Sequence, residues 1–233
     1  MHVLALDSCL GALSVAVGWH RQGEWQTQAA FERRTGGHAE RLMPMIAEVL
    51  GEAGVGFSAI DRIAVTVGPG SFTGVRVGVA AARGLALACA RPLIGATSLA
   101  VMAQEAWAQL GSAHGDRRLA VAVDARQGLL FLQLFAAGQG ACGPPALVAP
   151  AQAGALIGKR PVLLVGSGAE ALRAALTAAG GEAEAALGDL EPHARSLALM
   201  ATTLAPAGPV RPLYLRPPDA RAQSEKGLAR ARS

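Results

Sequence analysis

Hydrophobic and polar positions follow two alternating patterns along this chain. Short apolar runs that end in Gly or Asp are followed by longer runs rich in Ala and Leu. Runs of the first kind predict strands, and apolar residues that recur every three or four positions predict helices. The pattern predicts strands near residues 2–7, 13–18, 24–31, 62–67, 119–124, 129–135 and 162–166. It predicts helices near residues 38–53, 74–90, 97–110, 168–179 and 193–205, and a loop over the Gly- and Pro-rich residues 138–150. Strands and helices that alternate in this way are typical of an α/β fold.

One pattern occurs twice. An apolar strand ends in Asp7, Gly11 follows four residues later, and a second apolar strand returns. The same order recurs with Asp124 and Gly128. A strand-end Asp followed by a turn Gly is common by chance, but the match continues without a gap through the second strand, which favours duplication. Two similar lobes would each carry an Asp-bearing corner at one end of a sheet, where a cleft between them can bind phosphate and metal.

The expected domain organisation follows from this repeat. We expect an N-terminal lobe over residues 1–103, completed by the helix 193–205, and a smaller C-terminal lobe over residues 104–190. A Pro-rich, basic tail then covers residues 206–233, because repeated prolines prevent a regular helix there.

Composition places the chain among folded proteins. Of its 233 residues 52% are hydrophobic and 16% are charged, which excludes a disordered or solvating role. The net charge of +4 suggests nucleic-acid binding, but residues 209–233 carry the whole surplus and residues 1–208 are balanced. Nonspecific contact of this basic tail with a nucleic-acid phosphate backbone therefore stays open as an alternative. One Tyr and five Phe offer few stacking surfaces for RNA, and we expect no DNA binding.

The sequence lacks the motifs of several kinds of metal-binding, redox and catalytic site. The three cysteines Cys9, Cys89 and Cys142 have no CxxC spacing, which argues against disulfides and a Cys-rich zinc site and fits a reducing cytoplasm. Cys9 is expected to behave as a small hydrophobic residue. The five histidines show no metal-ligand spacing, and no GxSxG sequence occurs. Arg160 follows the one Gly-Lys pair, which excludes a Walker A loop. We also expect no signal peptide and no membrane span.

The most distinctive segment is Gly68-Pro-Gly-Ser-Phe-Thr-Gly-Val-Arg-Val-Gly78, which follows a predicted strand and opens a helix. Its glycines allow tight turns and close backbone approach, and Ser71 or Thr73 can cap the helix. Its spacing is GxGxxxG, which is not the dinucleotide-binding spacing. Two interpretations remain open: an anion-binding loop at a helix start, or a tight turn before a closely packed helix.

This segment closely resembles the signature of the bacterial TsaB (YeaZ) family. Four other segments agree in order and spacing: Leu6-Asp7-Ser8, Gly37-His-Ala-Glu-Arg-Leu42, Asp124-Ala-Arg-Gln-Gly128 and Pro212-Leu-Tyr-Leu-Arg216. The resemblance covers nearly the whole chain. It departs from the family pattern at Leu129, where relatives tend to carry Glu, and this weakens any role for an acid at that corner.

The resemblance implies the actin/Hsp70/sugar-kinase (ASKHA) fold with two duplicated α/β lobes. It implies a non-catalytic scaffold that activates TsaD, the subunit that transfers threonylcarbamoyl to N6 of adenosine 37 of tRNA, in a complex that also contains TsaE. We accordingly expect no catalytic residue, no metal and no cofactor. We also expect a homodimer when the chain is alone, through the same N-terminal lobe surface, and contact with tRNA only through the complex.

The candidate partner surface lies on the helices 38–53 and 74–90. Its residues are His38, Arg41, Leu42, Met45, Arg76 and Val79. The alternative is an active ASKHA ATPase or kinase with Mg-ATP or ADP between the lobes. The candidate nucleotide or phosphate residues are then Asp7, Ser8, Gly70, Ser71, Thr73, Asp124, Gly166 and Gly168, with Asp7 and Asp124 holding the magnesium ion. Against this alternative, the second lobe is short for a complete nucleotide site.

Overall fold

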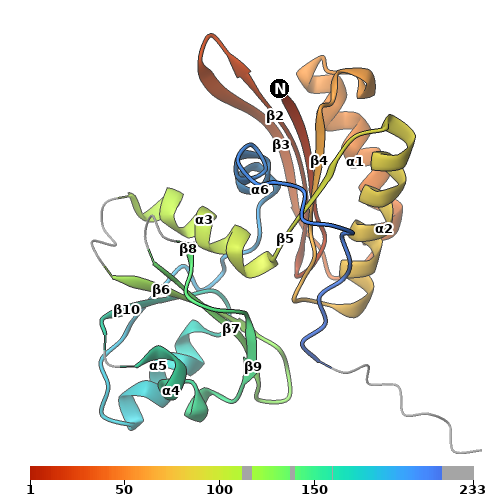
Figure 1. Cartoon of the computed structure of the whole chain (residues 1–233). Helices are drawn as coiled ribbons and strands as arrows, with labels where there is room; N and C mark the ends of the chain where they lie inside the picture. The colour runs from red at the N-terminus through yellow and green to blue at the C-terminus, as the bar shows by residue number, and fades with distance from the viewer. Residues whose placement is uncertain (112–116, 137–139, 159, 217–233) are drawn as a thin grey trace, which may run out of the picture.

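Two lobes, each built on one mixed sheet, make up the computed structural model, which describes residues 1–111, 117–136, 140–158 and 160–216 (Figure 1). The strand order of the first sheet is β3 (Glu24–Arg33), β2 (Ala12–Arg21), β1 (His2–Asp7), β4 (Arg62–Thr66) and β5 (Leu93–Ala96). Strand β2 runs antiparallel to β1 and β3, whereas β4 and β5 run parallel to their neighbours β1 and β4.

The hairpin of β2 and β3 has a two-residue turn. Gln22 and Gly23 have φ angles of 54° and 87°, which is the conformation of a type I′ turn. This turn places Arg21 opposite Glu24 and fixes the register of the whole ten-residue pair.

Helices cover both faces of the first sheet (Figure 1). Helices α1 (His38–Ala53) and α2 (Phe72–Cys89) bury one apolar face against β1, β2 and β4. Helix α6 (Ala194–Met200) packs on the opposite face, over β1 and β2. A short 3₁₀ helix (Phe57–Ala59) precedes β4.

The second sheet has the strand order β11 (Glu184–Ala186), β10 (Val162–Val165), β6 (Arg118–Asp124), β7 (Leu130–Ala136) and β8 (Gly140–Ala141), and β9 (Ala146–Val148) also pairs with β7. Helix α5 (Ala169–Ala178), the 3₁₀ helix η3 (Pro150–Gln152) and the short α4 (Gly154–Ile157) cover one face, and α3 (Ser98–Leu110) covers the other. Helix α3 also contacts α6, so it lies between the two sheets.

The two sheets share one topology. In both, an antiparallel hairpin is followed by two parallel strands added on the other side of the first strand, so β6, β7, β10 and β11 correspond to β1, β2, β4 and β5. This confirms the duplication that the repeated Asp-and-Gly pattern predicted. The residue numbers at which one lobe gives way to the other stay a prediction.

The structure differs from the predicted elements in the shortest ones. Strands β5 and β11, with four and three residues, were not predicted, because runs this short cannot show a recognisable alternation of apolar and polar residues. Residues 138–150, predicted as a loop, contain β8 and β9, apart from 138–139, which lie outside the described residues. The helix predicted over 193–205 ends at Met200. The hydroxyls of Thr202 and Thr203 donate to the carbonyls of Leu199 and Met200 and complete that end.

An ion pair between a buried Glu and a half-exposed Arg joins α3 to α6. Glu105 of α3 is 1% exposed and accepts hydrogen bonds from Arg195 at 3.1 Å and from the Ser196 hydroxyl at 2.7 Å. Burial raises the pKa of this carboxyl group, but the hydrogen bonds from Arg195, Gln109 and Ser196 outweigh burial and lower the pKa to about 2. The pair is therefore charged at neutral pH and fixes the position of α6.

Candidate functional site

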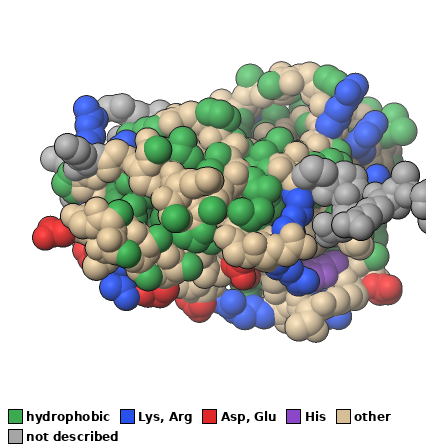
Figure 2. All heavy atoms as spheres, turned by 90° about the horizontal axis from the view of Figure 1, so that it is seen from below, with side chains coloured by type: hydrophobic (Ala, Val, Ile, Leu, Met, Phe, Trp, Pro, Cys, Tyr) green, Lys and Arg blue, Asp and Glu red, His purple; other side chains and the backbone are tan. Residues whose placement is uncertain are grey.

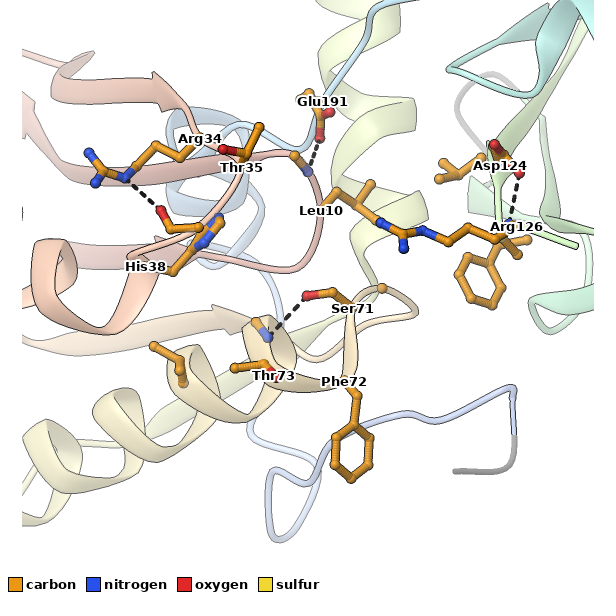
Figure 3. Close-up of a pocket in the computed structure, with 18 of the residues that line it drawn as sticks. Leu10, Arg34, Thr35, His38, Ser71, Phe72, Thr73, Asp124, Arg126 and Glu191 are labelled. Carbon is orange, nitrogen blue, oxygen red and sulfur yellow. Dashed lines mark hydrogen bonds between the residues drawn. The ribbon is translucent and has the colours of Figure 1, made fainter. Parts of the chain in front are cut away.

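A cavity of about 960 Å³ lies between the two lobes (Figure 3). It is lined by residues 10–11, 34–40, 70–74, 77, 123–126, 131, 167, 190–191 and 213–216. The starts of α1 and α2 meet there with the corner that follows β6. A cavity of this size is typical of small-molecule sites.

Helix α2 begins at this cavity. Ser71, one of the two caps that the sequence offered, is its N-cap, and the Ser71 Oγ accepts a hydrogen bond from the Gly74 N–H at 3.0 Å. The Ser71 N–H donates to the Cys9 carbonyl at 2.7 Å. A Cβ on Gly70 would lie 2.2 Å from the Cys9 oxygen, and one on Gly74 would lie 2.1 Å from the Ser8 oxygen. Only glycine fits at these two positions, because the loop packs directly on the backbone that follows β1.

Asp7 lies enclosed beneath this loop. Its side chain is 0% exposed, and its Oδ1 accepts hydrogen bonds from the Thr66 hydroxyl and, at 3.4 Å, from the Cys9 N–H. Its Oδ2 has no hydrogen-bond partner among the described residues. Burial raises the pKa of Asp7 to about 7. The neighbouring Ser8 hydroxyl is also buried and donates to the Gly74 carbonyl at 2.8 Å.

Cys9 is buried in the same place. Burial and the nearby Asp7 carboxylate raise the pKa of its thiol well above the usual value, and the thiol donates to the Thr66 hydroxyl oxygen at 3.1 Å. A thiol of this kind is unreactive, which confirms the prediction that Cys9 acts as a small buried residue.

The second lobe contributes Asp124 to the cavity wall. Its side chain is exposed and accepts a hydrogen bond from the Arg126 N–H at 2.7 Å, and the Asp124 N–H donates to the Ser167 hydroxyl at 3.0 Å. The side chain of Arg126 extends across the cavity toward Leu10 (Figure 3).

Two glycines of the second lobe face elsewhere. The Gly168 N–H donates to the Ala122 carbonyl at 2.9 Å, and a Cβ on Gly166 would lie 2.6 Å from the same oxygen. Both glycines therefore support the packing of β10 on β6 and lie outside the cavity wall. Of the candidate nucleotide residues, the structure brings four together at the cavity: Gly70, Ser71, Thr73 and Asp124. It does not place the other four in the wall: Asp7, Ser8, Gly166 and Gly168.

The C-terminal segment connects the two lobes beside the cavity. The Leu213 N–H donates to the Val67 carbonyl of the first lobe at 2.7 Å. Arg216 donates to the Ala125 carbonyl at 3.0 Å and to the Gln127 side chain at 2.7 Å in the second lobe. The segment therefore joins the lobes next to the cavity. Most of the predicted basic tail, residues 217–233, lies outside the described residues.

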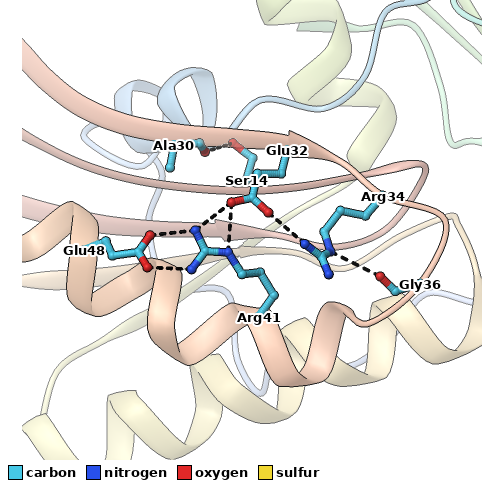
Figure 4. A network of polar contacts seen from close by, with 7 residues as sticks. All are labelled: Ser14, Ala30, Glu32, Arg34, Gly36, Arg41 and Glu48. Atoms are coloured by element: carbon cyan, nitrogen blue, oxygen red, sulfur yellow. Dashed lines mark hydrogen bonds and ion pairs between the residues drawn. The ribbon is translucent and has the colours of Figure 1, made fainter.

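Arg41 belongs to a polar network that fastens α1 to β3 (Figure 4). Its guanidinium group donates to Glu32 and to Glu48 at 2.6 Å each, and Arg34 donates to the second oxygen of Glu32 at 3.0 Å. These hydrogen bonds lower the pKa of Glu32 and Glu48 and raise that of Arg41. Arg41 is therefore engaged within the chain. His38, which begins α1, is half-buried, and its Nε2 has no hydrogen-bond partner among the described residues.

Three of the six candidate partner residues must be corrected. Leu42, Met45 and Val79 are 0–3% exposed and belong to the core of the first lobe, so they do not lie on a surface in the isolated chain. The reason is helical periodicity, since these positions share the helix face that packs on the sheet. Arg76 is exposed, stacks over the Phe72 ring at 4.1 Å and donates to the Tyr214 hydroxyl at 3.0 Å.

A different face of α2 is exposed and apolar. Leu87 is 84% exposed, and Ala80, Gly84 and Ala88 are exposed as well, with the exposed Arg83 lying between Ala80 and Leu87 at helical spacing. Met43 of α1 is 47% exposed. By length and composition α2 alone among the described helices could cross a membrane, with a mean hydropathy of 1.3, and 28% of it is buried. One side of this helix packs on the core of the first lobe, and the other side is exposed. Sequence reasoning missed this exposed face, because residues 72–89 are apolar on most sides and carry only Arg76 and Arg83 as charged residues.

Acidic and basic side chains both occur across the face of the molecule in Figure 2. Within the described residues, no three His, Cys, Asp or Glu side chains are grouped to hold a metal ion.

Comparison with known proteins gives the family. Residues 28–186 match the family model described as "TsaD: tRNA N6-adenosine threonylcarbamoyltransferase". The solved structure of YeaZ from Pseudomonas aeruginosa is 31% identical, with a TM-score of 0.70 over 87% of this chain and 92% of that one. A second solved structure, described as an uncharacterized protein with similarity to peptidase YeaZ from Pseudomonas aeruginosa, is 30% identical, with a TM-score of 0.73 over 92% and 99% of the two chains. The chain belongs to the TsaB (YeaZ) family.

Curated relatives of this family agree with the assignment. The tRNA threonylcarbamoyladenosine biosynthesis protein TsaB of Escherichia coli (strain K12) is 39% identical over 131 residues, 56% of this chain and 53% of that protein. The TsaB protein of Haemophilus influenzae is 39% identical over 129 residues, 55% and 51% of the two chains. The chain thus spans about half the length of the curated TsaB relatives it matches. The YeaZ structures and the duplicated topology confirm the predicted ASKHA fold.

Proposed function

We propose that this chain is a non-catalytic subunit in the synthesis of N6-threonylcarbamoyladenosine in tRNA and that it binds a TsaD-type paralogue. Two observations support a role of this chain in threonylcarbamoyladenosine synthesis. The curated relatives are named for threonylcarbamoyladenosine biosynthesis, and the matching family model is named for the threonylcarbamoyltransferase TsaD. The partner then shares the duplicated lobes of this chain, and TsaE and tRNA join the assembled complex in the cytoplasm.

The observation that carries the proposal is the exposed apolar face of α2. Monomeric proteins rarely leave a contiguous apolar face uncovered, and such faces mark contacts with other proteins. Leu87 supplies the largest exposed apolar side chain of this face, and the small residues Ala80 and Gly84 allow a second helix to approach closely. The corresponding helix of a paralogous lobe is the partner surface that this geometry fits best.

Two polar residues of the predicted partner surface, Arg76 and Arg41, have different surroundings. Arg76 is exposed and belongs to the same helix, while Arg41 is held by Glu32 and Glu48 within the chain. We therefore keep Arg76 as a contact residue and assign Arg41 the role of holding α1 in place.

The test is binding of purified TsaD by variants of the whole chain, measured by calorimetry. Because a buried arginine without a partner is costly, Leu87→Arg should weaken binding by at least about 30-fold. The matched control is Leu156→Arg, since Leu156 is 49% exposed on α4 of the other lobe. Wild-type affinity for a folded Leu87→Arg variant would refute this surface.

A reconstitution tests the function itself. The chain should raise the rate at which TsaD and TsaE modify tRNA, and it should modify nothing when TsaD is left out. Modification without TsaD would contradict a non-catalytic role.

A further inference from the structure

An exposed pair of aromatic rings lies where the C-terminal segment passes the start of α2. Phe72, the first residue of α2, is 43% exposed, and Tyr214 is 40% exposed. The centroids of the two rings are 5.1 Å apart, at an interplanar angle of 31°. The Phe72 ring is directed toward the C-terminal segment (Figure 3). The fold thus brings the one Tyr of the chain onto an exposed Phe.

Arg76 completes this cluster. Its guanidinium group lies 4.1 Å from the centroid of the Phe72 ring, and its Nε donates to the Tyr214 hydroxyl at 3.0 Å. Phe72, Arg76 and Tyr214 form what we call the aromatic platform. The three side chains hold one another in place before any ligand binds, which lowers the entropic cost of binding.

The two segments that form the aromatic platform carry positive charge only. Residues 62–104 contain four arginines and residues 192–218 contain three, and neither range contains Asp or Glu. Arg83 of α2 and Arg211 of the C-terminal segment are both exposed. The surface that these segments build therefore attracts anions.

The cavity beside the platform differs in charge. Its wall carries three arginines and three acids, which are Arg34, Arg126, Arg216, Glu40, Asp124 and Glu191. A polyanion is therefore favoured on the rim, at the platform, over the inside of the cavity.

We propose that the aromatic platform binds unpaired nucleotides of RNA. The bases stack on Phe72 and Tyr214, and the phosphates lie beside Arg83 and Arg211. Aromatic rings next to arginines suit single-stranded nucleic acid, because the rings stack on any base and the arginines neutralise phosphates. An acidic peptide would use the charges and leave the rings uncovered. The choice of RNA over DNA rests on the proposed function, whose substrate is a tRNA.

The platform borders the proposed TsaD surface without coinciding with it. Phe72 and Leu87 are fifteen residues apart on α2, which is about 22 Å along the helix. Arg76, one turn from Phe72, lies between them. RNA at the platform and a partner protein at Leu87 can therefore be bound at the same time.

The experiment is a fluorescence anisotropy titration of a labelled single-stranded RNA of about twelve adenosines with the whole chain, without TsaD. Phe72→Leu and Tyr214→Leu should each raise the dissociation constant at least about fivefold, because each removes a stacking ring. Tyr214→Phe keeps the ring and should change the dissociation constant less than about twofold. Phe57→Leu is the matched control and should bind as wild type does, since Phe57 is 39% exposed near the other end of α2, where Arg91 donates to the Ser58 carbonyl.

Two results would overturn the proposal. One is the absence of binding by wild type at low salt, and the other is a wild-type dissociation constant in both folded leucine variants, Phe72→Leu and Tyr214→Leu.

A competition separates stacking from charge. Residues 217–233 add four Lys or Arg and two acids, so the whole chain also attracts phosphates without the platform. Polyglutamate of the same total charge should displace the labelled RNA less effectively than unlabelled RNA does, because it has no rings to stack. Equal displacement would overturn the proposal. Because TsaD takes no part in either measurement, a failure here is distinguishable from a failure of the proposed TsaD surface.

Discussion

At the scale of single residues, Asp7 combines a predictable position with an unpredicted environment. The sequence shows an acid at the end of an apolar strand, which made Asp7 a candidate magnesium ligand. The structure encloses that acid completely, and its Oδ2 has no hydrogen-bond partner among the described residues. Burial favours the neutral carboxylic acid, so the side chain is a structural group rather than an exposed ligand.

The raised pKa of Asp7 predicts a pH dependence of stability. In the folded protein Asp7 keeps its proton up to about pH 7, whereas in the unfolded chain it loses the proton near the usual aspartate pKa of 3.8. The stability that Asp7 contributes is therefore fully present below pH 4 and is lost as the pH rises to 7. Relative to Asp7→Asn, the wild-type free energy of unfolding should fall by roughly 2–4 kcal/mol between pH 4 and pH 8. Urea unfolding of both proteins measures this, and parallel pH profiles would contradict it.

At the scale of elements, the glycines of α2 have two different roles. A Cβ on Gly74 would meet the backbone oxygen of Ser8, whereas one on Gly84 would meet nothing within 4 Å. Gly74→Ala should lower the free energy of unfolding by about 2–3 kcal/mol through overpacking. Gly84→Ala should raise it by up to about 1 kcal/mol, since alanine is the better helix former. Urea unfolding of the pair checks this, and equal effects would show that α2 does not rest on β1 as described.

The ion pair between α3 and α6 gives a second prediction at the scale of elements, which concerns the stability of the fold. Arg195→Met leaves the buried Glu105 carboxylate without its charged partner and should cost about 3 kcal/mol near pH 7. In wild type the pKa of Glu105 is about 2, so its contribution is lost only as the pH falls below 4. Without Arg195 that pKa rises, and the cost should shrink as the pH is lowered toward 4. Unfolding at pH 4.5 and 7.5 measures this, with Glu105→Gln as the control that carries no charge; a cost independent of pH would contradict it.

The helices show how much of the structure the pattern of apolar residues predicts. The bounds of α1, α2 and α3 were predicted to within two residues, because long amphipathic runs and a serine cap are local signals. The same periodicity that predicts α1 also predicts that Leu42 and Met45 face the core, so their choice as surface residues was wrong. The exposed face of α2 gives a weaker signal, since apolar residues occur around most of this helix and the arrangement of the lobe decides that Leu87 is uncovered.

The cavity shows which part of the candidate site could not be predicted from the sequence. The duplicated corners with Asp7 and Asp124 were visible in the sequence, and both lie where the topology requires. The closure of the loop 70–74 over Asp7 depends on contacts between segments about 60 residues apart, such as the bond from Ser71 to Cys9. Such a contact leaves no periodic trace in the sequence.

At the scale of the whole molecule, contacts within the chain join the two lobes beside the cavity. The C-terminal segment bonds to Val67 in one lobe and through Arg216 to the other, and the Glu105 ion pair fixes α6 against α3. A nucleotide held through magnesium between ASKHA lobes needs an accessible acid from each lobe. Here Asp124 is accessible and Asp7 is not.

Titration of Mg-ATP into the whole chain tests this arrangement. We expect no saturable heat at millimolar nucleotide and no release of phosphate, because Asp7 is sealed by backbone contacts at Gly70 and Gly74 that cannot separate without moving the start of α2. Asp124→Ala should accordingly behave as wild type. Saturable binding that is lost in both Asp7→Ala and Asp124→Ala would mean that the loop opens in solution, and it would make the chain a nucleotide-binding protein. Binding lost in Asp124→Ala alone would place the nucleotide on the second lobe and leave the sealed first lobe as described.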